Sequence, residues 1–133
     1  MSTIATASGS SALRIETDEA RLMILEQLER LLESHLFRNS KRYPNMLRHI
    51  VERTLAGQSE EIKERSLGVV VFGRSPDYDC SSDPVVRMSA AEIRKRLAQY
   101  YMEEGADAAL RIELQRGAYL PLFRYPRRGA AAS

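Results

Sequence analysis

Apolar residues recur at helical spacing near the start of the chain, where leucines and isoleucine alternate with glutamates over residues 17–35. This pattern predicts an amphipathic helix, which Thr17 or Asp18 can cap and in which Glu19 lies near the positive end of the helix dipole. Leu22 and Met23 widen the apolar stripe. The stripe either packs entirely into the core or also covers a second subunit, so a homodimer through this helix is among the expected partners.

A second helix is predicted between Asn39 or Ser40, either of which can cap it, and Gly57, which ends it. Pro44 falls in the first turn, where its missing amide proton costs little. The next stretch, residues 61–79, is ambiguous from the residues alone. Its three consecutive valines favour a strand, whereas a short helix would bury the same side chains.

The segment "DPVVRMSAAEIRKRLAQYY" predicts a long helix over 84–104, with Asp83 as its cap and Pro84 at its first position. At 100° per residue one stripe is apolar and faces the core: Val86, Ala90, Ile93, Leu97 and Tyr100. The opposite face carries Arg87, Met88, Ala91, Lys95 and Gln99, with Arg94 and Arg96 on the flanks. A solvated face would normally be filled with Glu, Lys and Gln, so this composition indicates a contact surface.

Alternating apolar and polar residues predict a β-hairpin over 110–124. Arg116 and Gly117 occupy its turn, so the hairpin has a basic tip. Pro121 in the second arm implies an edge position, because proline cannot donate a hydrogen bond to a neighbouring strand.

The length of 133 residues fits one domain, and 44% hydrophobic with 29% charged residues is typical of a globular protein. We predict that domain over 17–125, between disordered tails at 1–16 and 126–133 that show no apolar pattern. Twenty basic and eighteen acidic residues give a net charge of only +2, so bulk charge does not indicate a polyanion binder. No bilayer-length apolar run and no signal peptide occur, so we expect no membrane partner and a cytoplasmic location.

The chain does not predict an enzyme, a metal site or a cofactor. Cys80 is the only cysteine, which excludes an intrachain disulfide and a cysteine-based zinc cage. His35 and His49 lack metal-ligand spacing, and no nucleophile motif or phosphate-binding glycine loop occurs. A calcium loop starting at Asp77 would lack the glycine and the glutamate that an EF-hand needs at fixed positions.

Three segments resemble OmpR/PhoB-type winged helix-turn-helix domains of bacterial transcriptional regulators: "ERSLGVVVFGRSPDYD", "VVRMSAAEIRKRL" and "RIELQRGAYLPLF". The aromatic-glycine pair Phe72-Gly73 matches the end of a short helix in that family, and Gly117 with Tyr119 matches its wing. The segments "FRNSKRYPNMLRHIVERTLAG", "DPVVRMSAAEIRKRLAQYYMEEG" and "RIELQRGAYLPLF" together are similar to winged-helix domains at the N-termini of larger bacterial signalling proteins, and this chain resembles a standalone version of them. This likeness implies a short helix for the valine stretch. The family's preceding four-stranded sheet is replaced here by a helix.

The resemblance implies a mainly α fold with a C-terminal β-hairpin, in which the helix 84–104 enters the major groove of double-stranded DNA and the hairpin 110–124 is the wing. Ala91 would permit close approach to a thymine methyl, whereas Glu92 would either accept a hydrogen bond from cytosine or pair with Arg96. The expected DNA contacts are Arg87, Ser89, Ala91, Glu92, Arg94, Lys95 and Arg116.

A protein-interaction module is the alternative, because one fold supports unrelated functions. In that case Met88 and Ala91, or the N-terminal helix, would contact a protein partner instead of DNA. Salt separates the two functions, since DNA affinity falls steeply with ionic strength and apolar docking does not.

Overall fold

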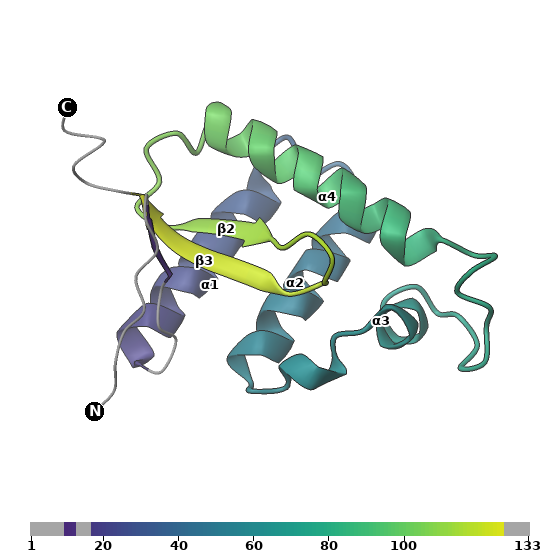
Figure 1. Cartoon of the computed structure of the whole chain (residues 1–133). Coiled ribbons are helices and arrows are strands. Elements are labelled where there is room, and N and C mark those ends of the chain that lie inside the picture. The colour runs from purple at the N-terminus through teal and green to yellow at the C-terminus, as the bar shows by residue number, and fades with distance from the viewer. Residues whose placement is uncertain (1–9, 13–16, 127–133) are drawn as a thin grey trace.

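The computed structural model describes residues 10–12 and 17–126 and confirms a mainly α-helical chain with a C-terminal antiparallel hairpin (Figure 1). The helices of these ranges are α1 (Asp18–Glu33), α2 (Arg42–Leu55), the 3-10 turn η1 (Ser59–Glu61), α3 (Glu64–Val70) and α4 (Val85–Met102). The strands are β1 (Ser10–Ala12), β2 (Arg111–Leu114) and β3 (Pro121–Pro126). The rest of the two predicted tails lies outside the described residues.

The starts of the first two helices differ in how well the sequence predicted them. Thr17 caps α1, because its Oγ1 accepts a hydrogen bond from the amide of Ala20 at 3.0 Å. The cap predicted for α2 at Asn39 or Ser40 is wrong, since Lys41 occupies the N-cap position and makes no side-chain capping bond. The helix starts later because the chain first makes a turn that buries Phe37 completely.

The valine stretch forms the short helix α3 and not a strand. Leu67 and Gly68 are its buried residues, while Val70 is 62% exposed. Gly73 follows with a φ of +70°, a conformation that other residues adopt only at a steric cost. The short helix therefore buries one leucine, and the chain then turns away into the long connection to α4.

The buried stripe predicted for α4 is confirmed in all five positions, which are at most 4% exposed. Its predicted cap is wrong. Pro84 occupies the N-cap position without a side-chain capping bond, and the carboxylate of Asp83 instead accepts from Nε of Arg74 at 2.6 Å. The ion pair with Arg74 is the main cause of the lowered pKa of Asp83, and the backbone amide of Val85 at the start of the helix contributes to it as well.

The sheet has the strand order β1-β3-β2, all antiparallel. Ser10–Ala12 pair with the end of β3, so this part of the predicted N-terminal tail is a strand, as is Pro126 of the predicted C-terminal one. The edge position inferred from Pro121 is also wrong, because β3 is the central strand. Proline is tolerated there as the first residue of the strand, and β1 pairs only with Arg124, Tyr125 and Pro126.

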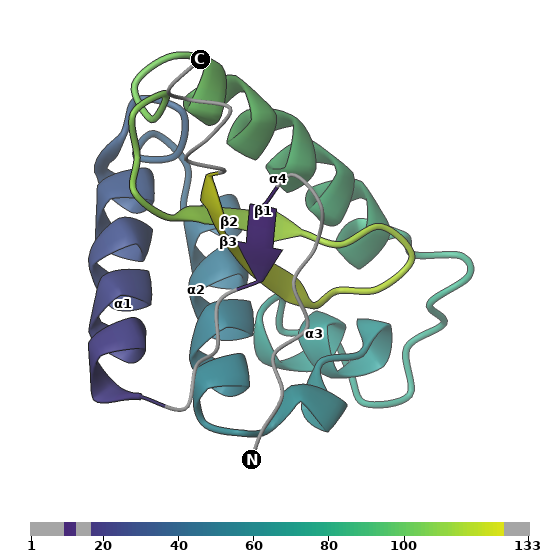
Figure 2. The ribbon, with the colours of Figure 1, turned by 60° about the vertical axis from the view of Figure 1, so that its left-hand side comes forward.

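One hydrophobic core joins the helices to the hairpin. Figures 1 and 2 show α1 and α2 side by side on one side of the sheet, and α4 running along β2. Leu28, Leu47, Ile93 and Ile112 come from four different elements and are completely buried in this core. The core thereby fixes α4 and the hairpin relative to each other, which sets the geometry of the predicted contact surface.

Candidate nucleic-acid interface

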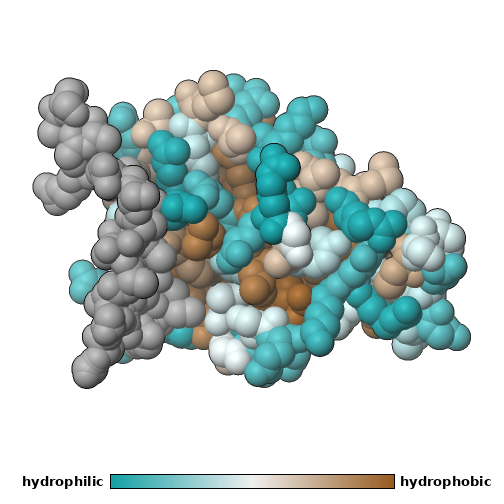
Figure 3. All heavy atoms as spheres, in the orientation of Figure 1, coloured by the Kyte–Doolittle hydropathy of each residue, from teal (hydrophilic) through white to brown (hydrophobic). Residues whose placement is uncertain are grey.

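The outward face of α4 is as predicted from the helical spacing. Met88 is 67% exposed, and the other four predicted positions are exposed as well. Ala98 is also exposed and was missed by sequence reasoning, although it lies two turns after Ala91 on the same face. In Figure 3, hydrophilic and hydrophobic side chains alternate over α4 along the upper part of the molecule. The face is therefore mixed and partly made of small side chains.

Ser89 cannot contact DNA in this structure, which corrects one of the seven predicted contacts. Its side chain is only 2% exposed, and its hydroxyl has no hydrogen-bond partner. Ser89 lies one turn from both Val85 and Ile93, on the buried side of the helix. The buried arc of α4 is wider than the apolar residues alone indicated.

Arg94 holds the turn of the hairpin. Its Nε donates to the carbonyl of Leu114 at 3.4 Å, and its Nη2 donates to the carbonyls of Gln115 at 2.7 Å and Ala118 at 3.1 Å. Two of the three guanidinium nitrogens are therefore engaged by the protein itself. The structure shows Arg94 as a residue that positions the hairpin tip beside α4.

Tyr101 lies seven residues after Arg94 on α4 and contacts the other end of β2. Its hydroxyl oxygen accepts hydrogen bonds from the amide of Ile112 at 2.7 Å and from Nε2 of Gln27 at 3.1 Å. Burial raises the pKa of Tyr101 to about 12. Because β2 is an edge strand, Tyr101 and Arg94 satisfy backbone groups that would otherwise be left open.

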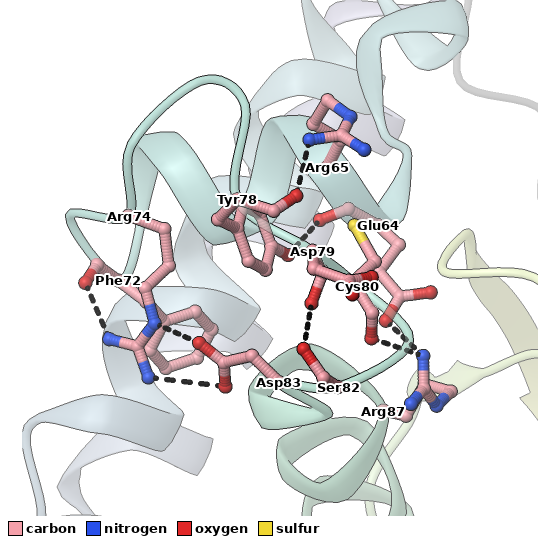
Figure 4. A network of polar contacts seen from close by, with 10 residues as sticks. All are labelled: Glu64, Arg65, Phe72, Arg74, Tyr78, Asp79, Cys80, Ser82, Asp83 and Arg87. Carbon is pink, nitrogen blue, oxygen red and sulfur yellow. Dashed lines mark hydrogen bonds and ion pairs between the residues drawn. The ribbon is translucent and has the colours of Figure 1, made fainter.

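Arg87 is tied to the preceding loop, as Figure 4 shows. Its Nη1 forms an ion pair with Glu64 at 2.5 Å and donates to the carbonyl of Cys80 at 3.1 Å. The same loop is held by the pair of Arg74 and Asp83, which lowers the pKa of the Asp83 carboxyl. The charge of Arg87 is balanced by Glu64, so this exposed arginine adds less positive potential than the sequence indicated.

Glu92 pairs with Arg96, which confirms one of the two roles left open for it. Nε of Arg96 lies 2.8 Å from the carboxylate, and this hydrogen bond is the main cause of the lowered pKa of Glu92. Arg96 also donates to the carbonyl of Leu36 at 2.8 Å and lies over the ring of Tyr43, 4.6 Å from its centroid. The pair balances the negative charge of Glu92 beside the outward face of α4.

Lys95 and Arg116 are the two basic predicted contacts that make no direct polar contact with another described residue, although the charge of Lys95 contributes to the lowered pKa of Glu92. Both are exposed, and neither forms a hydrogen bond or ion pair within the described residues. Arg116 precedes Gly117, whose φ of +78° allows the tight turn at the hairpin tip. Arg116 and Ala98 border the same hollow, so the basic tip lies alongside the exposed face of α4.

Comparison with protein-family models, with curated proteins and with solved structures gives no match to this chain. Among the described helices, none combines the length and the apolar character that crossing a membrane requires. Within residues 10–12 and 17–126, histidine, cysteine and acidic side chains form no group of three that could hold a metal ion.

Proposed function

We propose that the protein is a bacterial transcriptional regulator with an OmpR/PhoB-like winged helix-turn-helix that binds double-stranded DNA. In this proposal α4 enters the major groove and the hairpin of β2 and β3 is the wing. The observation that carries it is the exposed strip of Ala91, Lys95 and Ala98 on α4, next to a basic hairpin tip that Arg94 holds in place. A location in the cytoplasm follows from this role.

Each part of the strip has a task that DNA recognition requires. The small side chains of Ala91 and Ala98 let the helix backbone approach base edges closely, and Ala91 is suited to a thymine methyl. Lys95 and Arg116 are available for phosphates or, in the case of Arg116, for the minor groove. Arg87 is exposed enough to exchange its partner Glu64 for a phosphate.

Two uncommitted cations are few for tight DNA binding, because affinity grows with the number of phosphates neutralised. We therefore propose that the protein binds DNA as a homodimer formed through α1. Leu22 is 60% and Leu25 is 37% exposed, three residues apart on one face of that helix. Leu22→Gln is expected to shift the sedimentation of a dimer towards the monomer, and a wild-type monomer would rule out this arrangement.

The experiment that tests DNA binding is selection of bound sequences from a random duplex library, followed by titration at several salt concentrations. Each phosphate contact contributes about 0.9 to the slope of log affinity against log salt. Lys95→Gln and Arg116→Gln should each reduce this slope by about that amount. Arg30→Gln removes the same charge from the exposed side of α1 and serves as the matched control, which should keep the wild-type slope.

Ala91→Glu tests the helix face directly. Ala91 is exposed, so the substitution should leave the melting temperature unchanged while a carboxylate in the groove abolishes binding. Unchanged DNA affinity of Ala91→Glu, or no duplex selected at any salt concentration, would refute the proposed function.

A protein partner is the second candidate, and one observation favours it. Met88 and Met102 are 67% and 82% exposed on the helix, and flexible methionines are common on surfaces that bind other proteins. The charges of Arg87 and Glu92 are already balanced internally. Binding to a partner that hardly responds to salt, together with no DNA binding, would favour this function.

A further inference from the structure

We propose that the hollow between α4 and β2 is a binding site for a small anion with an apolar body, such as an aromatic carboxylate. The hollow has a volume of about 380 Å³, which lies within the range of small-molecule sites. In Figure 3, recessed hydrophobic atoms are visible between α4 and the hairpin, with hydrophilic side chains over them. The hollow overlaps the proposed DNA-binding surface at Ala98 and Arg116, but the binding of a small anion is tested on the free protein, so the two proposals can fail separately.

The apolar part of the site comes from one side of α4. Leu97, Ala98, Tyr101 and Met102 line it, and Leu114 of β2 faces them. Leu97 and Tyr101 are nearly buried, whereas Ala98 and Met102 are exposed at the mouth. A hydrated inorganic ion gains nothing from such walls, whereas a flat ring or short chain would be removed from water there.

The charged part of the site comes from β2 and the hairpin tip. Arg111 lies over the ring of Tyr101, 5.2 Å from its centroid, and its buried Nε has no hydrogen-bond partner. The guanidinium of Arg111 forms no hydrogen bond or ion pair within the described residues, so its outer nitrogens keep their donors for an acceptor in the hollow. Arg116 also borders the hollow and is uncommitted within the described residues.

The local charge balance favours an anion. Glu113 is the acidic residue among the lining side chains, but its carboxylate accepts from Nε of Arg124 at 2.9 Å. Arg94 also lines the hollow and is engaged by backbone carbonyls, which do not cancel its charge. A planar carboxylate matches the forked donors of an arginine, and such bidentate pairs are among the stronger hydrogen bonds in proteins.

The test uses 2-naphthoate and its uncharged analogue 2-naphthamide, each titrated calorimetrically into the full chain without DNA. We expect 2-naphthoate to bind, with 2-naphthamide about tenfold weaker, because the amide cannot form the charge-assisted pair. Amide resonances of α4 and β2 around the hollow should shift on binding. Equal affinity for the two compounds, or shifts confined to other elements, would overturn the proposal.

Variants locate the two parts of the site. Arg111→Gln should weaken 2-naphthoate about tenfold, whereas Arg30→Gln, which removes the same charge elsewhere, should have no effect. Ala98→Phe fills the mouth from an exposed position, so it should block binding at an unchanged melting temperature, and it keeps the test decisive if Arg111→Gln does not fold. Retained binding in a folded Ala98→Phe protein would exclude this hollow as the site.

Discussion

Tyr101 and Arg94 bind the open edge of β2 from the same helix, but their surroundings are opposite. Tyr101 is 6% exposed, and the groups that donate to its hydroxyl are buried. Arg94 is partly exposed and bonds three carbonyls of the hairpin turn, at the surface of the molecule. Water can replace a lost contact at the Arg94 end and cannot do so at the Tyr101 end.

This difference assigns separate tasks to the two contacts. A buried donor without an acceptor costs free energy in the folded state only, so Tyr101 stabilises the fold as a whole. At the exposed end the protein stays folded when the Arg94 contacts are lost, but the hairpin tip is no longer held in one position. Arg94 therefore controls where Arg116 lies relative to α4, and in the proposed function this is a property of the DNA-binding surface.

The largest effect is expected for Tyr101→Phe. The substitution keeps the ring and leaves the amide of Ile112 and the side-chain amide of Gln27 without their acceptor. We expect the free energy of unfolding to fall by about 2 kcal/mol, as measured by urea denaturation. Tyr100→Phe is the matched control, since Tyr100 is 4% exposed and its hydroxyl makes no hydrogen bond within the described residues. Equal losses in the two variants would show that the hydrogen bonds of Tyr101 are not what stabilises this end.

Arg94→Ala should have a smaller and more local effect. We expect a loss of about 1 to 1.5 kcal/mol, because water can solvate the three released carbonyls. Amide exchange should separate the two ends of β2. The amide of Gln115, which bonds the carbonyl of Leu120 across the turn, should exchange about tenfold faster, while that of Ile112 stays protected. Equal acceleration at both amides would mean that the hairpin opens as a unit.

Local spacing predicted the positions of α1, α2, α4 and the hairpin, whereas the short helix α3 followed only from the family resemblance. Both faces of α4 were predicted except at Ser89, which is buried. Val86 and Ile93 are buried, and Lys95 is exposed, as the helical period requires. The helix end at Gly57, with its φ of +77°, also depends on one residue and its backbone. The winged-helix assignment and the DNA contacts remain predictions.

The partners of charged side chains could not be predicted, because they join residues far apart in the chain. Arg94 contacts carbonyls about twenty positions later, and Arg87 pairs with Glu64 across the loop before α4. From their positions on the predicted helix alone, both arginines were expected to be available for contacts with DNA. Strand β1 was missed for a similar reason, since its short polar segment gains its structure only by pairing with β3.

The smallest effect is expected at alkaline pH, because the burial of Tyr101 opposes the ionisation of its phenol more strongly than its two hydrogen bonds favour it. Its pKa is about 12 in the folded protein against an ordinary value of 10.0. The resulting stabilisation is fully present below pH 10 and is lost as the pH rises towards 12, because the unfolded chain ionises first. At pH 11 the stabilisation that has been lost amounts to about 1 kcal/mol. Urea midpoints measured between pH 8 and pH 11 should therefore fall more steeply for the wild type than for Tyr101→Phe. Arg94→Ala should keep the wild-type dependence of the urea midpoint on pH, because it leaves the buried end of β2 intact. Parallel curves of urea midpoint against pH for the wild type and Tyr101→Phe would place the phenol in contact with water.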